Sequence, residues 1–317
     1  MRRASRGRSV RSAPRLPLRH AVALGLLHGP TELLPVSSSA HTTLVPWLLD
    51  WSYGELDPEL RKSFEVALHA GAAAALLVRP PWGMREGRPW GHGKDGVPRG
   101  LDAKLGFFAL AVVPPALAGY ALGERIEQQL GTPTTIAAGL LAGSGAMIAA
   151  ERSSRARVGT PRGSTQLPLA RVGRTPGATT HNADQGPAAG PGPLDGLALG
   201  CAQSLALMPG VSRSGATLAA ARARGFSRRD SDRLSWKVGL PVIAGAALLK
   251  GTRLAREGTP RGLRLPLAAG AASAFLSTLA STRVLGPERR AALLPACAAY
   301  RGALAVLVIR RMRDNTS

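Results

Sequence analysis

The sequence is built around the stretch Gly25-Leu-Leu-His28-Gly-Pro-Thr-Glu32-Leu-Leu-Pro35-Val-Ser37-Ser38-Ser39-Ala-His41. It places one acid, two histidines and three consecutive hydroxyls in an otherwise apolar region. In lipid, ionisable side chains face a cavity or a partner, so a group of this kind indicates a functional site. The prolines interrupt a helix and free backbone amides and carbonyls, which at membrane depth are satisfied by protein or by a water-filled cavity. The stretch therefore predicts a broken or re-entrant helix that carries a site.

A second polar stretch occurs in the other half of the chain and reads Pro209-Gly210-Val-Ser212-Arg213-Ser214-Gly215-Ala-Thr217. It offers a cation, hydroxyls and glycine-freed backbone amides, which together suit an anion. A shift of 175 residues pairs Gly25 with Gly200 and Ser37 with Ser212. The two stretches are therefore predicted to be repeats. A broken polar segment in each half of a membrane protein points to a site at the interface between the repeats.

Basic residues outnumber acidic ones, with 41 Lys and Arg against 19 Asp and Glu and a formal net charge of +22. Such a charge is typical of proteins that bind nucleic acid or an anionic membrane surface. The arginines cluster between apolar blocks, and aromatic residues make up only 4% of the chain, which leaves few rings for stacking on bases. The sequence thus favours a membrane protein and no nucleic-acid partner.

Five apolar segments have about the 17 to 25 residues that a membrane-spanning helix needs. They are rich in Gly, Ala and Ser, which lower the hydropathy but let helices approach closely in a membrane. The expected fold is therefore all-α, a polytopic integral membrane protein of two inverted repeats whose broken helices carry the site. The five segments cover residues 105–122, 134–150, 234–249, 263–280 and 291–309.

Changes in composition divide the chain into five parts. Residues 1–19 hold seven arginines and no acid, which predicts a basic disordered arm near anionic lipid. Residues 20–150 form the first membrane half and residues 194–310 the second. Between them, residues 151–193 are a flexible basic linker rich in Gly and Pro, and residues 311–317 are a basic tail. The positive-inside bias places the arm and the linker in the cytoplasm.

At these residues the chain resembles the undecaprenyl-diphosphate phosphatase family of bacitracin-resistance membrane enzymes. Residues 28–41 match its first signature, Glu-Gly-x-Thr-Glu-Phe-Leu-Pro-[Val/Ile]-Ser-Ser-[Thr/Ser]-Gly-His, except that His28, Leu33 and Ala40 replace the usual Glu, Phe and Gly. The second signature, Pro-Gly-x-Ser-Arg-Ser-Gly-Ala-Thr, is met in full by residues 209–217. Smaller matches occur at residues 64–66, 240–246 and 300–301, so the resemblance runs in order from about residue 20 to residue 309.

The resemblance implies hydrolysis of undecaprenyl diphosphate to undecaprenyl phosphate and phosphate, which recycles the lipid carrier of peptidoglycan synthesis. It also implies a divalent cation, Mg²⁺ or Ca²⁺, with Glu32 as a metal ligand. The family's pair of acids is reduced here to one, because His28 replaces the first acid, and these ions prefer oxygen ligands. The dependence on such an ion is therefore open, and His28 is expected to act as an acid or base or to bind the metal more weakly.

The candidate catalytic residues are Glu32, Ser38, Ser39, His41 and Arg213. Phosphoryl transfer depends mainly on positioning and charge stabilisation, and an arginine flanked by glycines suits a diphosphate. Either serine is a candidate nucleophile activated by His41, or the serines bind phosphate while water attacks. Glu32 is alternatively a general base, and His41 a proton donor to the leaving group. The expected substrate-binding residues are His28, Ser37, Gly210, Ser212, Ser214 and Thr217.

Three further polar residues lie in apolar segments. His69 follows Glu65 by one helical turn, and the two either face the cavity or form a structural pair. Arg301, in the last apolar segment, is expected to support the fold rather than to contact the substrate.

The expected setting is the plasma membrane, crossed several times, with the site accessible from the outer face. The expected partner is a polyprenyl diphosphate lipid, and a homodimer is left open. The alternative function is a transporter or flippase for an anionic lipid or solute, because inverted repeats with broken helices are also a transporter architecture. A transporter moves its substrate across liposomes without releasing phosphate. A membrane anchor that recruits anionic partners is a third interpretation, and it leaves the Ser, His and Arg residues unexplained.

Overall fold

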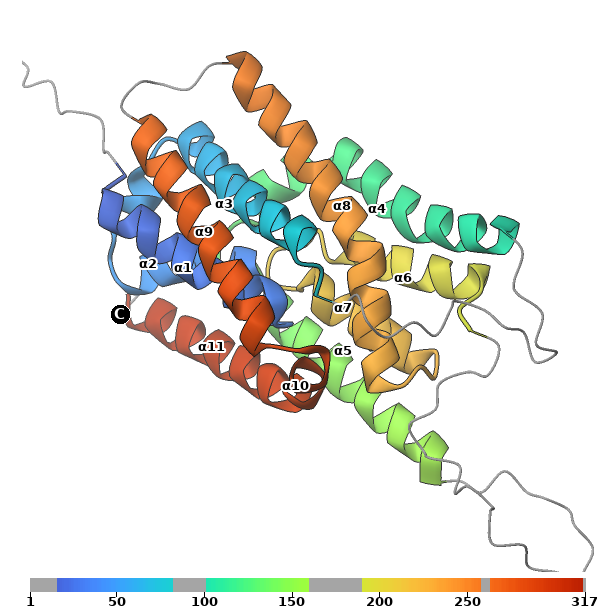
Figure 1. Ribbon diagram of the computed structural model, residues 1–317. Helices are drawn as coiled ribbons and strands as arrows, with labels where there is room; N and C mark the ends of the chain where they lie inside the picture. Colours follow the sequence, from blue (N-terminus) through green and yellow to red (C-terminus); the bar gives the residue numbers. More distant parts are fainter. Residues whose placement is uncertain (1–15, 82–100, 160–189, 258–262, 316–317) are drawn as a thin grey trace, which may run out of the picture.

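The computed structural model describes residues 16–81, 101–159, 190–257 and 263–315, which form a bundle of helices without strands (Figure 1). Most of the predicted arm and linker lies outside these residues. The helices are α1 (Leu18–Leu33), α2 (Ser38–Leu48), the 3-10 helix η1 (Ser52–Glu55), α3 (Pro58–Val78), α4 (Leu101–Leu130), α5 (Pro133–Gly159), α6 (Pro193–Leu205), α7 (Arg213–Ala223), α8 (Arg228–Glu257), α9 (Arg264–Val284), α10 (Pro287–Ala292) and α11 (Leu294–Asp314).

The helices of the second half repeat the order of those in the first. Helices α1 and α6 begin 175 residues apart, and so do α2 and α7. Helix α1 packs along α9, and its counterpart α6 packs along α4, the counterpart of α9 (Figure 1). This exchange of partners is what an approximate two-fold relation between two halves produces. The prediction of an all-α fold built from two repeats is confirmed.

The apolar core repeats with the helices. Leu24 of α1 and Leu199 of α6 occupy equivalent positions, and both side chains are fully buried. Leu24 belongs to a cluster with Phe64 of α3, and Leu199 to a cluster with Phe107 of α4 and Val238 of α8. Each repeat therefore packs its first helix between a helix of its own half and one of the other half.

Each half contains a broken helix, as the prolines and glycines predict. Helix α1 ends at Leu33 and α2 begins at Ser38, while α6 ends at Leu205 and α7 begins at Arg213. The chain between the two pieces leaves the regular helical pattern and keeps only turn bonds such as that from the Val211 amide to the Met208 carbonyl at 3.2 Å, so several of its amides and carbonyls need other partners. Most of the polar residues singled out in the sequence lie in these two interruptions or in the helix ends that flank them.

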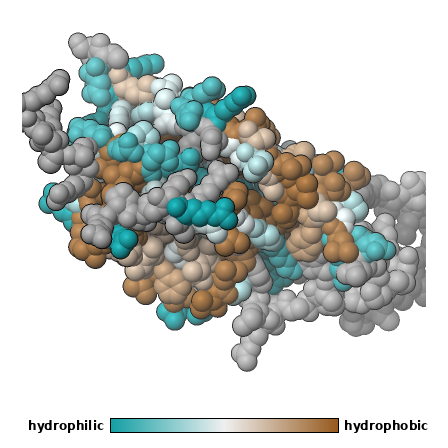
Figure 2. Space-filling model, turned by 90° about the horizontal axis from the view of Figure 1, so that it is seen from above, coloured by the Kyte–Doolittle hydropathy of each residue, from teal (hydrophilic) through white to brown (hydrophobic). Residues whose placement is uncertain are grey.

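Three helices are long and apolar enough to cross a membrane: α4 over Asp102–Gly123, α5 over Pro133–Ala156 and α9 over Arg264–Val284. Only 17% of the apolar window in α4 is buried, so most of its leucines and valines point outward. Figure 2 shows hydrophobic residues gathered over much of the face seen from above. Apolar surface of this extent suits a lipid environment. The protein is therefore a membrane protein. Helix α5 continues beyond residue 150, so the stretch predicted to be a flexible linker begins with a helix.

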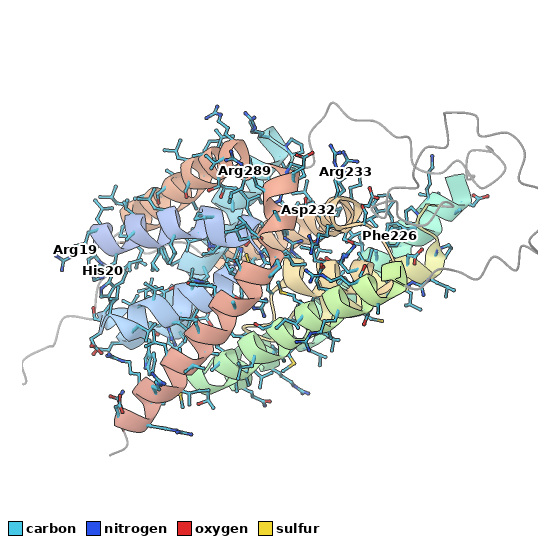
Figure 3. All side chains as sticks on the ribbon, turned by 90° about the horizontal axis from the view of Figure 1, so that it is seen from below. Arg19, His20, Phe226, Asp232, Arg233 and Arg289 are labelled. Atoms are coloured by element: carbon cyan, nitrogen blue, oxygen red, sulfur yellow. The ribbon has the colours of Figure 1, made fainter. Side chains whose placement is uncertain are left out.

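A buried ion pair ties the short helix α10 to the start of α8. Arg290 donates to both carboxylate oxygens of Asp232, at 3.0 and 2.6 Å, and to the carbonyl of Pro81 at 2.9 Å. Both side chains of the pair are almost completely buried, and Figure 3 labels Asp232 at this junction. A bidentate arginine–carboxylate contact fixes the relative orientation of the two side chains as well as their distance. It therefore sets the start of α8, which carries residues of the site further along.

Candidate active site

The two interrupted helices restart through matching turns. Ser37 and Ser212 precede α2 and α7 and have positive φ values of 75° and 69°. This region costs a residue other than glycine about 1–3 kcal/mol, so its surroundings must hold it there. Each serine hydroxyl accepts a hydrogen bond from the amide three residues on, Ala40 at 3.4 Å and Gly215 at 3.2 Å. The equivalent geometry confirms that the two polar stretches are repeats.

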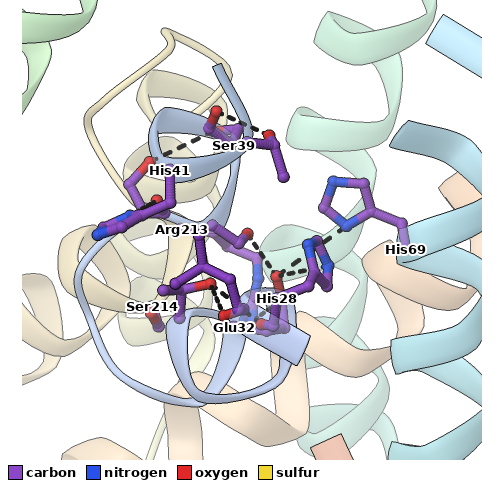
Figure 4. Close-up of polar contacts among 12 residues, drawn as sticks. His28, Glu32, Ser39, His41, His69, Arg213 and Ser214 are labelled. Atoms are coloured by element: carbon purple, nitrogen blue, oxygen red, sulfur yellow. Dashed lines mark hydrogen bonds and ion pairs between the residues drawn. The ribbon is translucent and has the colours of Figure 1, made fainter. Parts of the chain in front are cut away.

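Glu32 is the point at which the two halves meet. Its side chain is only 7% exposed. Ser38, the first residue of α2, donates its hydroxyl to Glu32 Oε2 at 2.6 Å, and Arg213, the first residue of α7, donates Nη2 to Oε1 at 3.4 Å (Figure 4). The carboxylate thus holds a candidate nucleophile on one oxygen and a cation on the other.

Two residues of α8 position the guanidinium of Arg213. Its Cζ lies 4.9 Å from the centre of the Trp236 ring, a cation–π distance. A Cβ on Gly239 would lie 1.8 Å from Arg213 Nη1, so only glycine leaves room for this side chain. Arg213 Nη1 is buried and has no hydrogen-bond partner among the described residues. It therefore remains able to donate to an anionic oxygen in the site.

Two imidazoles lie beside the same carboxylate. His28 Nε2 is 3.8 Å from Glu32 Oε2, one turn earlier on α1, and His69 Nδ1 of α3 is 4.0 Å from it. The two rings meet edge to face, with their centroids 4.7 Å apart (Figure 4). His69 is 38% exposed, so the cluster can be reached from outside. His69 thus lies beside the predicted site residues Glu32 and His28.

His41 lies in a different contact network. Its Nδ1 is 2.7 Å from the Ser37 carbonyl oxygen, and its Nε2 is 2.7 Å from the Tyr300 hydroxyl. Its ring also stacks on that of Tyr300, and in Figure 4 it points away from the pair formed by His28 and His69. These contacts hold the turn that starts α2. A proton-transfer role for His41 stays a prediction.

The remaining hydroxyls fall into equivalent pairs with different surroundings. Ser37 and Ser39 Oγ are 3.3 Å apart, as are Ser212 and Ser214 Oγ. Ser39 is exposed, whereas Ser214 is buried. Fully buried Thr217 bonds the Arg213 carbonyl at 2.9 Å, and its hydroxyl lies 2.5 Å from that of Ser235. Of the three consecutive serines, Ser38 is the one that contacts Glu32 directly.

Arg301 forms hydrogen bonds with both interruptions. The side chain is completely buried and donates to the carbonyls of Pro35 at 3.0 Å and of Gly210 and Val211 at 2.9 Å each. It thereby satisfies backbone groups that the broken helices leave open. The structure therefore supports the expectation that Arg301 stabilises the fold. Gly210, at φ +91°, combines a left-handed turn with this carbonyl contact.

The structure adds residues that sequence reasoning passed over as site residues. The predicted site residues are contacted or positioned by Trp236, Gly239, Ser235 and Tyr300. The sequence held a signal for three of them. Residues 236–240, Trp-Lys-Val-Gly-Leu, resemble residues 64–68, Phe-Glu-Val-Ala-Leu, at the equivalent place in the other half, and Tyr300 precedes Arg301 in a short family match. Their contacts depend on how α8 and α11 pack, which the motifs do not specify.

The chain is similar to known proteins over most of its length. Residues 21–307 match the model of the family described as bacitracin resistance protein BacA. An undecaprenyl-diphosphatase of Geobacter sulfurreducens is 36% identical over 274 residues, which cover 83% of this chain and 86% of the relative. One from Acidiphilium cryptum is 33% identical over 302 residues, covering 91% and 97%. Both the interrupted helices and the residues around Glu32 fall within the matched region, and the chain belongs to the bacitracin resistance protein BacA family.

Proposed function

We propose that this protein is an integral membrane hydrolase that converts undecaprenyl diphosphate to undecaprenyl phosphate and inorganic phosphate. The observation that carries the proposal is the contact of Glu32 with both Ser38 and Arg213 at the meeting point of the two repeats. A carboxylate, a hydroxyl and a guanidinium at one point are the groups that phosphoryl transfer uses. The names of the relatives give the substrate. The product returns a lipid carrier to peptidoglycan synthesis.

The geometry favours Ser38 as the nucleophile. Glu32 takes the proton of the Ser38 hydroxyl, and the oxygen forms a bond to the terminal phosphorus while the bond to the bridging oxygen breaks. Undecaprenyl phosphate leaves, and water then hydrolyses the phosphoserine, releasing phosphate and restoring the hydroxyl. In the alternative route Glu32 deprotonates water, which attacks the phosphorus directly. In both routes Arg213 stabilises the charge on the transferred group.

The donors around Glu32 do not fit the Mg²⁺ or Ca²⁺ that the family resemblance implies. Hard cations of this kind prefer oxygen ligands, whereas the groups nearest to Glu32 Oε2 include the imidazoles of His28 and His69. No step of the reaction is therefore assigned to Mg²⁺ or Ca²⁺. The carboxylate, hydroxyl and guanidinium supply base, nucleophile and charge stabilisation without one.

An apolar pocket beside the site suits a lipid substrate. It has a volume of about 560 Å³ and lies between α3, α4 and α8, where Leu77, Phe108 and Leu240 line it. Leu240 packs in one apolar cluster with Trp236, whose ring makes the cation–π contact with Arg213. A polyprenyl chain held there keeps its diphosphate near the guanidinium. In this proposal the chain crosses the plasma membrane several times, with the site open to the outer face, and a homodimer stays a prediction.

The function is tested by phosphate release from undecaprenyl diphosphate with the purified full-length protein in detergent. Arg213→Ala is expected to lower kcat/KM at least about 100-fold, because it removes the charge stabilisation of the transferred group. Gly239→Ala is expected to lower it about tenfold, since the new Cβ displaces the same guanidinium.

Gly245→Ala is the matched control, because it makes the same change on the same helix where a Cβ meets open space. It should release phosphate like the wild type. Undiminished release by Arg213→Ala would show that the site is misassigned. Transport of substrate into liposomes without phosphate release would replace the phosphatase by the transporter.

A further inference from the structure

The cluster of His28, Glu32 and His69 has the composition of a metal site. One ligand atom from each residue can be chosen so that all lie within 4.8 Å of one another. His28 and Glu32 are held one turn apart on α1, and His69 reaches them from α3. Three ligands therefore come from two packed helices, which fix their relative positions better than a loop would.

His28 lacks the partners that a buried histidine normally has. Its side chain is completely buried, and neither ring nitrogen has a hydrogen-bond partner among the residues that the structure describes. Burying polar groups without hydrogen bonds is unfavourable, so such groups in a native structure call for an explanation. A bound cation supplies one, because a neutral imidazole nitrogen offers its lone pair to the metal.

The candidate metal ligands gather on one side of the Glu32 carboxylate. Arg213 contacts Oε1, while both imidazoles and the Ser38 hydroxyl are nearest to Oε2. Zn–ligand bonds of about 2.0–2.2 Å put neighbouring ligand atoms of a tetrahedral ion about 3.4 Å apart. The separations of 3.8 and 4.0 Å between the imidazole nitrogens and Oε2 are close to this value. Binding an ion would draw the three ligand atoms, which now lie within 4.8 Å of one another, closer together.

We propose that His28, Glu32 and His69 bind a borderline transition-metal ion of the Zn²⁺ type in preference to Mg²⁺ or Ca²⁺. Two imidazoles and one carboxylate are a ligand set that zinc sites use, whereas hard cations select oxygen. Three protein ligands leave one coordination position open, and the exposure of His69 makes that position reachable from outside. The inference concerns the same cluster as the phosphatase proposal but does not need hydrolysis to occur.

The test is metal binding by full-length protein without a polyhistidine tag, stripped with chelator and equilibrated with equimolar Zn²⁺, Mg²⁺ and Ca²⁺. We expect about one Zn²⁺ per chain and no stoichiometric Mg²⁺ or Ca²⁺. His28→Gln and His69→Gln should each weaken Zn²⁺ binding at least about tenfold, since each removes a ligand. In the wild type, Co²⁺ should give the visible absorption of a tetrahedral site, and the signal should vanish in both variants.

His20→Gln is the matched control. His20 is also a histidine of α1, but it stacks on Trp51 at the start of the helix (Figure 3). Its Zn²⁺ binding should equal that of the wild type. His28→Glu restores a pair of acids and should shift the preference toward Mg²⁺ and Ca²⁺.

Unchanged Zn²⁺ binding in the combined His28→Gln and His69→Gln variant would overturn the inference, and so would a wild type that takes up Mg²⁺ or Ca²⁺ instead. The outcomes for binding and catalysis remain separate. Zn²⁺ bound by these residues without phosphate release would contradict only the phosphatase proposal. Phosphate release that is indifferent to chelator, by a protein that binds no Zn²⁺, would contradict only the metal site.

Discussion

At the scale of single residues, the three consecutive serines at 37, 38 and 39 have three different surroundings. The first accepts the cap bond of α2, the second donates to Glu32, and the third is exposed and lies 3.3 Å from the first, hydroxyl to hydroxyl. Chemical roles follow from these contacts. Glu32 is buried at the centre, so a change at a group that touches it should have the largest effect on turnover.

Ser38→Ala should lower kcat for phosphate release at least about 100-fold, because it removes the hydroxyl that Glu32 activates. Ser39→Ala, the control from the same turn, loses one partly buried contact between neutral hydroxyls and should lower kcat less than about tenfold. Steady-state kinetics of the two variants measure the difference. Equal losses would remove the distinction between the two serines.

Trapping the intermediate separates the two routes of attack. Acid quenching of the wild type with substrate labelled in its terminal phosphate should leave label on Ser38. A fully active enzyme that is never labelled would select the direct attack of water.

At the scale of secondary-structure elements, the two interruptions are held together by a residue outside both. Arg301 lies on α11, and its guanidinium donates hydrogen bonds to carbonyls of the chain before α2 and of the chain before α7. It therefore fixes the distance between the first residues of α2 and α7, which are Ser38 and Arg213. Two helix starts at fixed separation are what a diphosphate needs in order to meet both residues at once.

Arg301→Met should lower the free energy of unfolding by at least about 2 kcal/mol, since several buried carbonyls lose a charged donor. Thermal unfolding in detergent measures the change. Arg310→Met on the same helix is the control, because Arg310 is exposed and its removal uncovers no carbonyl of the interruptions. A wild-type melting temperature for Arg301→Met would show that these carbonyls find other partners.

At the scale of the whole molecule, the two repeats pack against each other through equivalent contacts. The first helix of each half presses a glycine against the other half. A Cβ on Gly25 would lie 2.0 Å from Ser273 Oγ, and one on Gly200 would lie 2.2 Å from the Leu110 carbonyl oxygen. Small residues at such contacts let membrane helices approach closely. The centre of the site depends on this packing, because α1 carries Glu32.

Gly25→Ala and Gly200→Ala should each destabilise the protein by about 1–3 kcal/mol, because the added methyl group has no space in either contact. The two losses should be similar, since the positions are equivalent. Gly302→Ala, on α11 where a Cβ meets open space, should leave the melting temperature unchanged or raise it. A large loss for one glycine only would argue against equivalent packing of the two halves.

The sequence by itself determined the all-α membrane character, the two broken helices and the repeat of 175 residues, and it offered Glu32, Ser38, Ser39, His41 and Arg213 as catalytic candidates. These follow from local features: apolar segment lengths, prolines and glycines, and polar residues at fixed spacing. Only the tertiary structure decided that His69 joins Glu32, that His41 instead contacts Tyr300, and that Gly239 makes room for Arg213. Those contacts join residues far apart in the chain. They depend on how α3, α8 and α11 pack against the broken helices, and the spacing of residues within one helix does not specify its neighbours.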